Sequence, residues 1–314
     1  MAVERQTAKT ATGEQPAVSV VVPCFNGGAF LPQLLDSLAR QTFRDFEIII
    51  VDDGSTEPAT RAALAALGPS IRVIRQNNRG LSAARNTGIA QARADLVLPL
   101  DCDDMFAPPF LAEAVPMLLA APADVAMVLC HKALSGAAGG LLERHFNRFD
   151  LLFANPVPSG VLLRKACWQE AGGYDETMRD GYEDWEFYLR LMRCGYRGIT
   201  IPMPYLIYNV SSQGMLFNQS SGKHAAIWRV IRRKHAAAYR PLAMWRLWLA
   251  SRDGSGRDDP GHVSALRALT AYLMAVALPD RFFSMLIALR RRRLLLGGHR
   301  PAYTPHKIEA PPVT

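Results

Sequence analysis

Apolar runs and helical spacing alternate regularly along the first hundred residues of the chain. Short β-branched or apolar runs predict strands at residues 18–22, 46–51, 71–74 and 96–100. Between them, apolar residues recur at helical spacing and predict helices at residues 30–41, 60–67 and 81–92. Strands that alternate with helices in this way favour an α/β fold, with a mostly parallel central sheet flanked by helices.

The pattern is less regular after residue 105 and becomes basic after residue 221. Helical spacing returns at residues 110–119 and 185–194, and residues 125–130 look like a strand. We expect four regions, namely a disordered N-terminus (1–16), the sheet domain (17–215), a helical basic C-terminal region (216–299) and a proline-containing disordered tail (300–314).

Polar clusters stand directly after three of the predicted strands, at residues 26–28, 52–54 and 101–104. In parallel α/β sheets, ligands bind outside the carboxyl ends of the strands. Three of the residues at 101–104 are aspartates, and neighbouring carboxylates resist ionisation unless a cation neutralises them. Mg²⁺ and Mn²⁺ take oxygen ligands and commonly bridge to phosphates, so this cluster indicates a metal–diphosphate site. Taken alone, a solvated acidic turn explains the cluster about equally well.

Composition narrows the class of protein. Hydrophobic residues make up 49% of the chain, which is enough for a sizeable core. The five cysteines are scattered without a Cys-x-x-Cys pair, which argues against a disulfide framework or a zinc site and fits a reducing compartment. Residues 1–16 lack the apolar core of a signal peptide. The apolar stretch at 268–279 is shorter than the about 20 residues that a membrane-spanning helix needs, so we expect a cytoplasmic protein without one.

Charge is distributed unevenly along the chain. Residues 223–314 hold 17 Lys and Arg against 5 Asp and Glu, whereas residues 1–222 hold 19 against 23. Basic helices that also carry Trp and Leu favour attachment to an anionic membrane surface, here the inner face. The alternative is a helical extension that packs on the sheet domain or on a second copy. No motif supports nucleic-acid binding.

Six short motifs follow one another between residues 18 and 208. They read VVVPCFN at 20–26, QTF at 41–43 with FEIIIVDDGS at 46–55, NNRGLSAARNTG at 77–88, DCDD at 101–104, GGYDE at 172–176 and EDW at 183–185. Together they resemble the family-2 inverting glycosyltransferases, whose nucleotide-sugar-binding fold is of the GT-A type. The resemblance implies attack by an acceptor hydroxyl on the anomeric carbon of a nucleotide sugar. By family habit the nucleotide is UDP and the product belongs to surface polysaccharide or glycolipid assembly.

The same resemblance assigns the nucleotide-sugar side. Pro23 and Asn26 belong to the opening motif, and Asp53 matches the carboxylate that accepts a hydrogen bond from the base ring. Arg85, inside the matched motif, is expected near the nucleotide, and Arg79 is a second candidate; the alternative for both is a solvated helix face.

The acidic element is expected to hold both the ribose and the cation. Mg²⁺ or Mn²⁺ at Asp103 and Asp104 would neutralise the charge that develops on the leaving diphosphate. Asp101 and Asp103 are also within the motif that reaches the ribose hydroxyls. Which of the three carboxylates binds the metal directly stays open, and one of them is expected to act only as a capping residue.

The last two motifs suggest the acceptor side and the general base. Asp184 is the candidate base, with Glu183 expected to raise its pKa and Trp185 to shield it. Tyr182 and Trp185 are expected to stack on a sugar face, and Gly173 lies in the acceptor-side motif. The alternative is that the acids simply favour the N-terminus of a helix, which is compatible with catalysis.

Other functions fit the sequence less well. The Gln-x-x-Arg-Trp motif of processive synthases is missing, which favours addition of one sugar per encounter. A sugar-1-phosphate nucleotidyltransferase needs a basic, Gly-rich loop after its first strand, but residues 23–28 contain no basic residue. A non-catalytic nucleotide-sugar-binding protein would be expected to lack the acidic element or the Glu-Asp pair, and both are present.

Overall fold

A computed structural model describes residues 15–136, 139–210 and 223–251, together with nine single positions between 266 and 285. The predicted disordered ends lie outside these residues, apart from residues 15 and 16. The predicted domain boundary at residue 215 also lies outside the described residues. None of the helices in the described ranges is long and apolar enough to cross a membrane.

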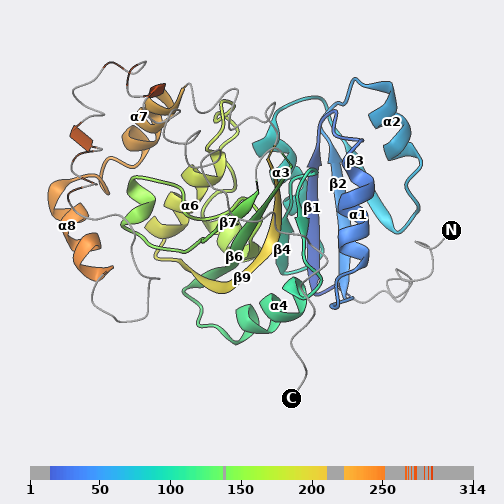
Figure 1. The fold of residues 1–314 in the computed structure, drawn as a ribbon, viewed down its shortest axis with the longest axis horizontal. Helices are drawn as coiled ribbons and strands as arrows, with labels where there is room; N and C mark the ends of the chain where they lie inside the picture. Colours follow the sequence, from blue (N-terminus) through green and yellow to red (C-terminus); the bar gives the residue numbers. More distant parts are fainter. Residues whose placement is uncertain are drawn as a thin grey trace.

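A nine-stranded sheet forms the centre of the molecule (Figure 1). Its main path runs β3-β2-β1-β4-β8-β6-β9-β5, and β7 pairs with β6 at the side. The strands are β1 (Val18–Cys24), β2 (Phe46–Asp52), β3 (Ile71–Arg75), β4 (Leu96–Pro99), β5 (Met105–Phe106), β6 (Val125–Gly136), β7 (Gly140–Leu142), β8 (Leu162–Arg164) and β9 (Arg197–Val210).

The expected parallel arrangement is confirmed for one half of this sheet. Strands β1 to β4 pair in parallel, as predicted from their alternation with helices. The other half is mixed, because β8 pairs antiparallel with both β4 and β6, β5 pairs antiparallel with β9, and β6 pairs in parallel with β9. The sequence pattern missed β9, whose two prolines disguise a 14-residue strand.

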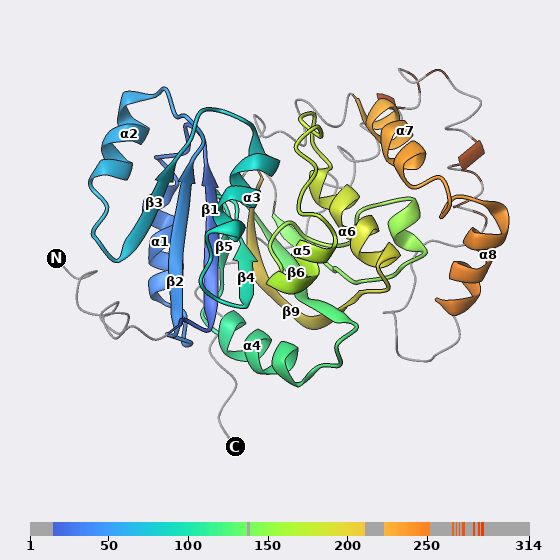
Figure 2. The ribbon, with the colours of Figure 1, turned by 180° about the vertical axis from the view of Figure 1, so that it is seen from behind.

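Helices cover both faces of the sheet, as Figures 1 and 2 show from opposite sides. The helices are α1 (Leu31–Ala39), α2 (Pro58–Ala65), α3 (Leu81–Ala90), α4 (Phe110–Ala120), α5 (Lys165–Glu170), α6 (Glu183–Arg193), α7 (His224–Lys234) and α8 (Pro241–Ala250), with a 3-10 turn η1 (Asp150–Leu152).

Two hydrophobic cores result from the alternation of side chains along the central strands. One contains residues of α1 and α4 together with Val20 and Val22, and the other contains residues of α3, α6 and α7 together with Val21. Helix α3 approaches β1 closely because Gly88 has no side chain, since a Cβ there would lie 2.3 Å from a methyl carbon of Val21. Because α7 contributes to the second of these cores, the first helix of the basic C-terminal region packs on the sheet domain.

Candidate active site

The loops after β1, β2 and β4 meet at one edge of the sheet, as predicted. Residues Cys24 and Asp52 are partners in the parallel register, so the loops that follow them are neighbours. Asn26, with φ 53°, accepts hydrogen bonds from the backbone N–H groups of Thr56 at 2.8 Å and Glu57 at 3.0 Å, and so fastens these two loops together. Gly27 lets the acidic loop come close, since a Cβ on it would lie 2.5 Å from Cys102 Sγ.

Asp53 is buried and organises the loop that leads into α3. Its Oδ1 accepts hydrogen bonds from the Arg79 N–H at 2.9 Å and from the Gln76 side chain at 2.7 Å, and its Oδ2 accepts one from the Gly80 N–H at 2.8 Å. A carboxylate has about four acceptor positions, so one is left for a ligand. Its neighbour Asp52 accepts a hydrogen bond from the Ser55 N–H at 2.8 Å and caps the turn.

Arg85 of α3 connects the acidic strand end to the start of α6. The side chain is 1% exposed, its Nη2 lies 2.5 Å from Asp101 Oδ1, and its Nη1 lies 2.6 Å from Glu183 Oε1. Although burial by itself would lower the pKa of Arg85, these two carboxylates raise it well above its ordinary value. The guanidinium group of Arg85 is thus buried and paired with two carboxylates, and its contact with the nucleotide stays a prediction.

Arg79, the second arginine of the same motif, lies at the surface. Its side chain is paired with Glu176 at 2.6 Å, and both groups are largely exposed. The motif at 77–88 therefore contains one buried and one solvent-facing arginine.

Two carboxyl groups of the acidic element, those of Asp103 and Asp104, have raised pKa values. Burial and the charge of Asp101 raise the pKa of Asp103 to about 6. Asp104 is buried, and burial raises its pKa well above the ordinary value. Its Oδ1 accepts a hydrogen bond from the Asn209 N–H at 3.2 Å, and its Oδ2 has no hydrogen-bond partner in the described part of the chain.

These oxygen donors fit a hard divalent cation in chemistry, because a cation would neutralise both carboxylates and supply a partner for the buried oxygen. The described residues nevertheless contain no group of three or more His, Cys, Asp or Glu side chains already gathered around a single point. A cation would therefore complete its ligand shell with oxygens from outside the protein, as Mg²⁺ commonly does with water and substrate phosphates.

Lys132 of β6 is a charged neighbour that the sequence reasoning missed. It is buried, and its ammonium group lies 4.1 Å from the centre of the Tyr208 ring. Burial and the charge of Arg144 lower the pKa of Lys132 to about 8. Asp104, Asp184 and Asp101 act in the opposite direction, so this ammonium interacts with carboxylates from both sides of the site. Its position inside the apolar run at 125–134 could have indicated a buried charge in the sequence.

Asp184 lies in the first turn of α6 and is only partly buried. Its Oδ2 accepts a hydrogen bond from Asn155 Nδ2 at 3.0 Å, and its Oδ1 accepts one from the Trp185 N–H at 2.7 Å. The predicted rise in its pKa is confirmed in direction, but burial is the main cause, opposed by the charges of Arg85 and Lys132. Glu183, which we expected to cause this rise, pairs with Arg85, and its own pKa is raised by burial and by the charge of Asp184.

The stacking of Tyr182 and Trp185 on a sugar stays a prediction, and their burial does not favour it. Both rings are buried in the core, where the Trp185 Nε1–H donates a hydrogen bond to the Leu151 carbonyl oxygen at 2.6 Å. Asp184 points into the site from the first turn of α6, and the next residue is therefore directed about 100° around the helix, into the interior. Gly173, with φ 70°, lies in a tight turn where a Cβ would meet Asn86 Oδ1 at 2.8 Å.

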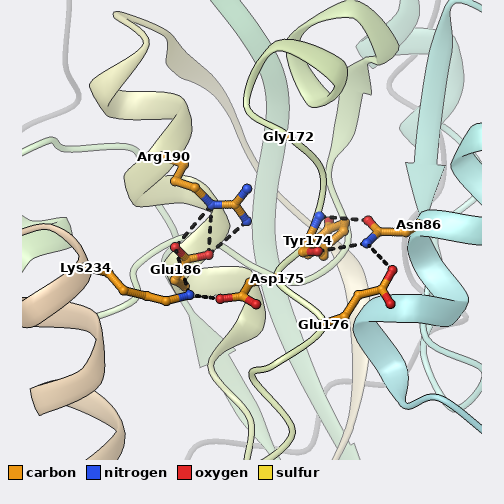
Figure 3. A pocket seen from close by; sticks show the side chains of 8 residues that line it. All are labelled: Asn86, Gly172, Tyr174, Asp175, Glu176, Glu186, Arg190 and Lys234. Atoms are coloured by element: carbon orange, nitrogen blue, oxygen red, sulfur yellow. Dashed lines mark hydrogen bonds and ion pairs between the residues drawn. The ribbon is translucent and has the colours of Figure 1, made fainter.

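A pocket of about 420 Å³ lies beside this region (Figure 3). Its lining is mostly charged and internally paired, with Arg190 against Glu186 at 2.9 Å and Lys234 against Asp175. It shares Tyr174 with the environment of Arg85, whose guanidinium lies 5.3 Å from the ring centre. Asp184 and the residues assigned to the nucleotide do not line it, so we do not place the reaction there.

Comparison with known proteins agrees with this geometry. The family model described as Glycosyl transferase family 2 matches residues 19–165. The uncharacterized glycosyltransferase YwdF of Bacillus subtilis is 30% identical over 204 residues, which is 63% of this chain and 75% of YwdF. Chondroitin synthase of Escherichia coli is 28% identical over 198 residues, which is only 27% of that protein.

Solved structures agree in fold. Residues 1–349 of TarS from S. aureus, in complex with UDP-GlcNAc, have a TM-score of 0.57 at 18% identity and cover 88% of this chain and 90% of that one. The mannosyltransferase PcManGT of Pyrobaculum calidifontis, in complex with GDP-Man and Mn²⁺, has a TM-score of 0.53 at 22% identity and covers 90% and 88%. The expected GT-A fold is confirmed, and the chain belongs to glycosyltransferase family 2.

Proposed function

We propose that this glycosyltransferase uses a nucleotide-diphosphate sugar, with UDP as the nucleotide. The acceptor attacks in a single displacement, which inverts the configuration at the anomeric carbon. The observation that carries the proposal is the bridge from Asp101 through Arg85 to Glu183, at 2.5 and 2.6 Å. It holds the end of β4, where the donor phosphates are expected, at a fixed position relative to the first turn of α6. In this proposal Asp184, which lies in that first turn, faces the donor from the α6 side of the site.

The donor side is assigned to the loops after β1, β2 and β4. Pro23 and Asn26 shape the first of these loops, and Asp53 has one acceptor position left for a ring N–H of the base. Asp101 is a quarter exposed while it is paired with Arg85, so one of its oxygens is available to a ribose hydroxyl. The UDP and UDP-GlcNAc complexes of TarS support the choice of UDP only by likeness of fold.

Asp103 and Asp104 are the residues that would hold Mg²⁺ or Mn²⁺. Such a cation would neutralise the charge on the departing diphosphate as a Lewis acid. Burial and the charge of Asp101 raise the pKa values of both carboxyl groups, and a bound cation would favour their ionised forms.

Asp184 is the proposed general base, which takes the proton from the acceptor hydroxyl. The hydrogen bonds from Asn155 and from the Trp185 N–H fix the orientation of its carboxylate. Burial raises its pKa toward the range in which a carboxylate accepts a proton efficiently, while Lys132 and Arg85 keep it ionised. Glu183 does not touch the substrate in this scheme and acts as a positioning residue through Arg85. Gly173 shapes the acceptor side.

We also propose that transfer is non-processive, that the acceptor is part of a surface polysaccharide or glycolipid, and that the protein attaches to the inner face of the membrane. The missing processive motif and the basic C-terminal region support these points. The division into a domain at 17–215 and a region at 216–299 is likewise kept as a proposal.

The test combines a donor panel with one variant and one control. UDP-glucose, UDP-galactose, UDP-GlcNAc, GDP-mannose and dTDP-rhamnose are tested for binding and slow hydrolysis with Mn²⁺ and with EDTA. Asp184→Asn should nearly abolish transfer while nucleotide binding is kept, because only the proton acceptor is lost. Asp36→Asn, on the exposed face of α1, is the matched control and should act like the wild type. Full activity of Asp184→Asn would exclude Asp184 as the base.

A further inference from the structure

Helix α8 carries an apolar stripe on its solvent side. Leu242, Trp245 and Leu249 are 60%, 54% and 48% exposed, and none of the ten residues of α8 is buried. Their spacing of three and then four residues places them on one face of the helix. An exposed stripe of large apolar side chains is a usual mark of an interaction surface.

The opposite face of α8 fixes the direction in which this stripe points. Met244, Leu247 and Trp248 pack against the core that contains α6 and α7. The rings of Trp245 and Trp248 lie 5.0 Å apart, so the exposed indole is in contact with one that packs on the core. The helix is therefore apolar on two opposite faces, and only one of them finds a partner among the described residues.

The surroundings of the stripe are cationic. Arg246 is exposed and follows Trp245 on the helix, and the exposed Arg240 immediately precedes its first residue. Residues 223–314 as a whole hold 17 Lys and Arg against 5 Asp and Glu. Of these, 7 Lys and Arg and no Asp or Glu lie in the described residues 223–251, and Figure 1 shows α7 and α8 together at the end of the molecule opposite α2.

We propose that Leu242, Trp245 and Leu249 of α8 insert into the headgroup region of an anionic membrane, with Arg246 and Arg240 against the lipid phosphates. Trp and Leu beside Arg are the residues that lie in such interfaces. A second copy of the chain fits the stripe less well. In a two-fold contact centred on the stripe, Arg246 of one copy would approach Arg246 of the other, and the two positive charges would repel each other. The inference specifies the surface for the attachment proposed above and does not depend on the catalytic assignments.

The experiment is vesicle flotation of the full chain. Vesicles of phosphatidylcholine alone are compared with vesicles that also contain phosphatidylglycerol, at low and high salt. The triple variant Leu242→Gln/Trp245→Gln/Leu249→Gln should bind the anionic vesicles at least about tenfold more weakly, because three apolar side chains lose their insertion. Arg246→Gln should weaken binding about fivefold and reduce its dependence on salt. Leu119→Gln on α4, where the side chain is 62% exposed, is the matched control and should bind like the wild type.

Two measurements keep the outcomes distinct. UDP binding by each variant shows that the protein is folded and separates a failure of this inference from a failure of the proposed reaction. The inference is overturned if the triple variant floats with anionic vesicles as well as the wild type does. It is also overturned if the wild type ignores all vesicles but forms a dimer that the triple variant loses, since the occupant would then be a second copy.

Discussion

Replacement of Arg85 with methionine should destabilise the protein strongly, because it leaves two carboxylates at a buried site without their cation. Arg85 is 1% exposed, and the side chains of its partners Glu183 and Asp101 are 8% and 25% exposed. Removal of one member of a buried ion pair costs about 3–5 kcal/mol. Because Asp101 can recover contact with water and Glu183 cannot, we expect about 3 kcal/mol, most of it arising from Glu183.

The origin of this loss can be isolated with a double-mutant cycle. Glu183→Gln alone keeps an acceptor for Arg85 and should cost about 1–2 kcal/mol. In the Arg85→Met background the same change removes an uncompensated charge and should stabilise the protein, so the coupling free energy should be at least about 2 kcal/mol. Urea unfolding followed by tryptophan fluorescence measures all four proteins.

The pH dependence gives an independent check. Burial already raises the pKa of Glu183 in the folded protein, and loss of the opposing Arg85 charge raises it further. A carboxyl group with a raised folded pKa binds more protons folded than unfolded, so the stability of Arg85→Met relative to wild type should fall as pH rises through that pKa. The variant should therefore lose the least stability relative to wild type under acidic conditions.

Arg79→Met is the matched control, since Arg79 belongs to the same motif and pairs with Glu176 at 2.6 Å, but at the surface. Exposed ion pairs contribute little, so this variant should stay within about 0.5 kcal/mol of wild type. Equal losses for Arg85→Met and Arg79→Met, or additive effects in the cycle, would refute the bridging role.

Three further predictions concern the charges and the packing around the site. Lys132→Met should shift the acidic limb of the kcat/KM profile to higher pH, because the lysine charge lowers the pKa of Asp184; an unshifted limb would contradict this. Mn²⁺ affinity should weaken at least about tenfold per pH unit below about 6, because Asp103 must lose a proton of pKa about 6 to bind metal; calorimetry at several pH values with a flat result would argue against Asp103. Gly88→Ala should destabilise the protein by about 1–3 kcal/mol in thermal unfolding, because its Cβ would lie 2.3 Å from a buried methyl carbon, whereas Gly68→Ala meets nothing within 4 Å and should be neutral.

The first half of the fold was predictable because its information is local. Strands buried on both faces appear as continuous apolar runs, and the predicted strand at 46–51 differs from β2 by only one residue. Strand β9 was missed because Pro202 and Pro204 argue against a central strand. In the structure the register with β6 jumps from Ile201 to Leu206, so both prolines lie where no ladder hydrogen bonds are formed.

The site was predictable by residue type but not by pairing. Asp101 and Asp184 stand in motifs that could be found in the sequence, and both act on Arg85 in the structure. The contact of Arg85 with Glu183 joins residues 98 positions apart, and no local pattern specifies such a partner. The burial of Trp185 could not be predicted for a related reason, because an aromatic residue beside an acid gives no sign of which helix face it occupies.

The helix that presents Asp184 depends on the C-terminal region for its position. Tyr182, the residue before α6, is held at φ 63°, a left-handed conformation that costs a non-glycine residue about 1–3 kcal/mol. Its hydroxyl group lies 3.0 Å from Nδ1 of His224, the first residue of α7, and His235 just beyond α7 lies 3.2 Å from Glu186 of α6. Both contacts are buried, so α7 stabilises the strained turn from which the proposed base is oriented. The basic region is thus joined to the catalytic helix at α7 and turned toward solvent at α8, which allows one segment both to orient Asp184 and to present the apolar stripe.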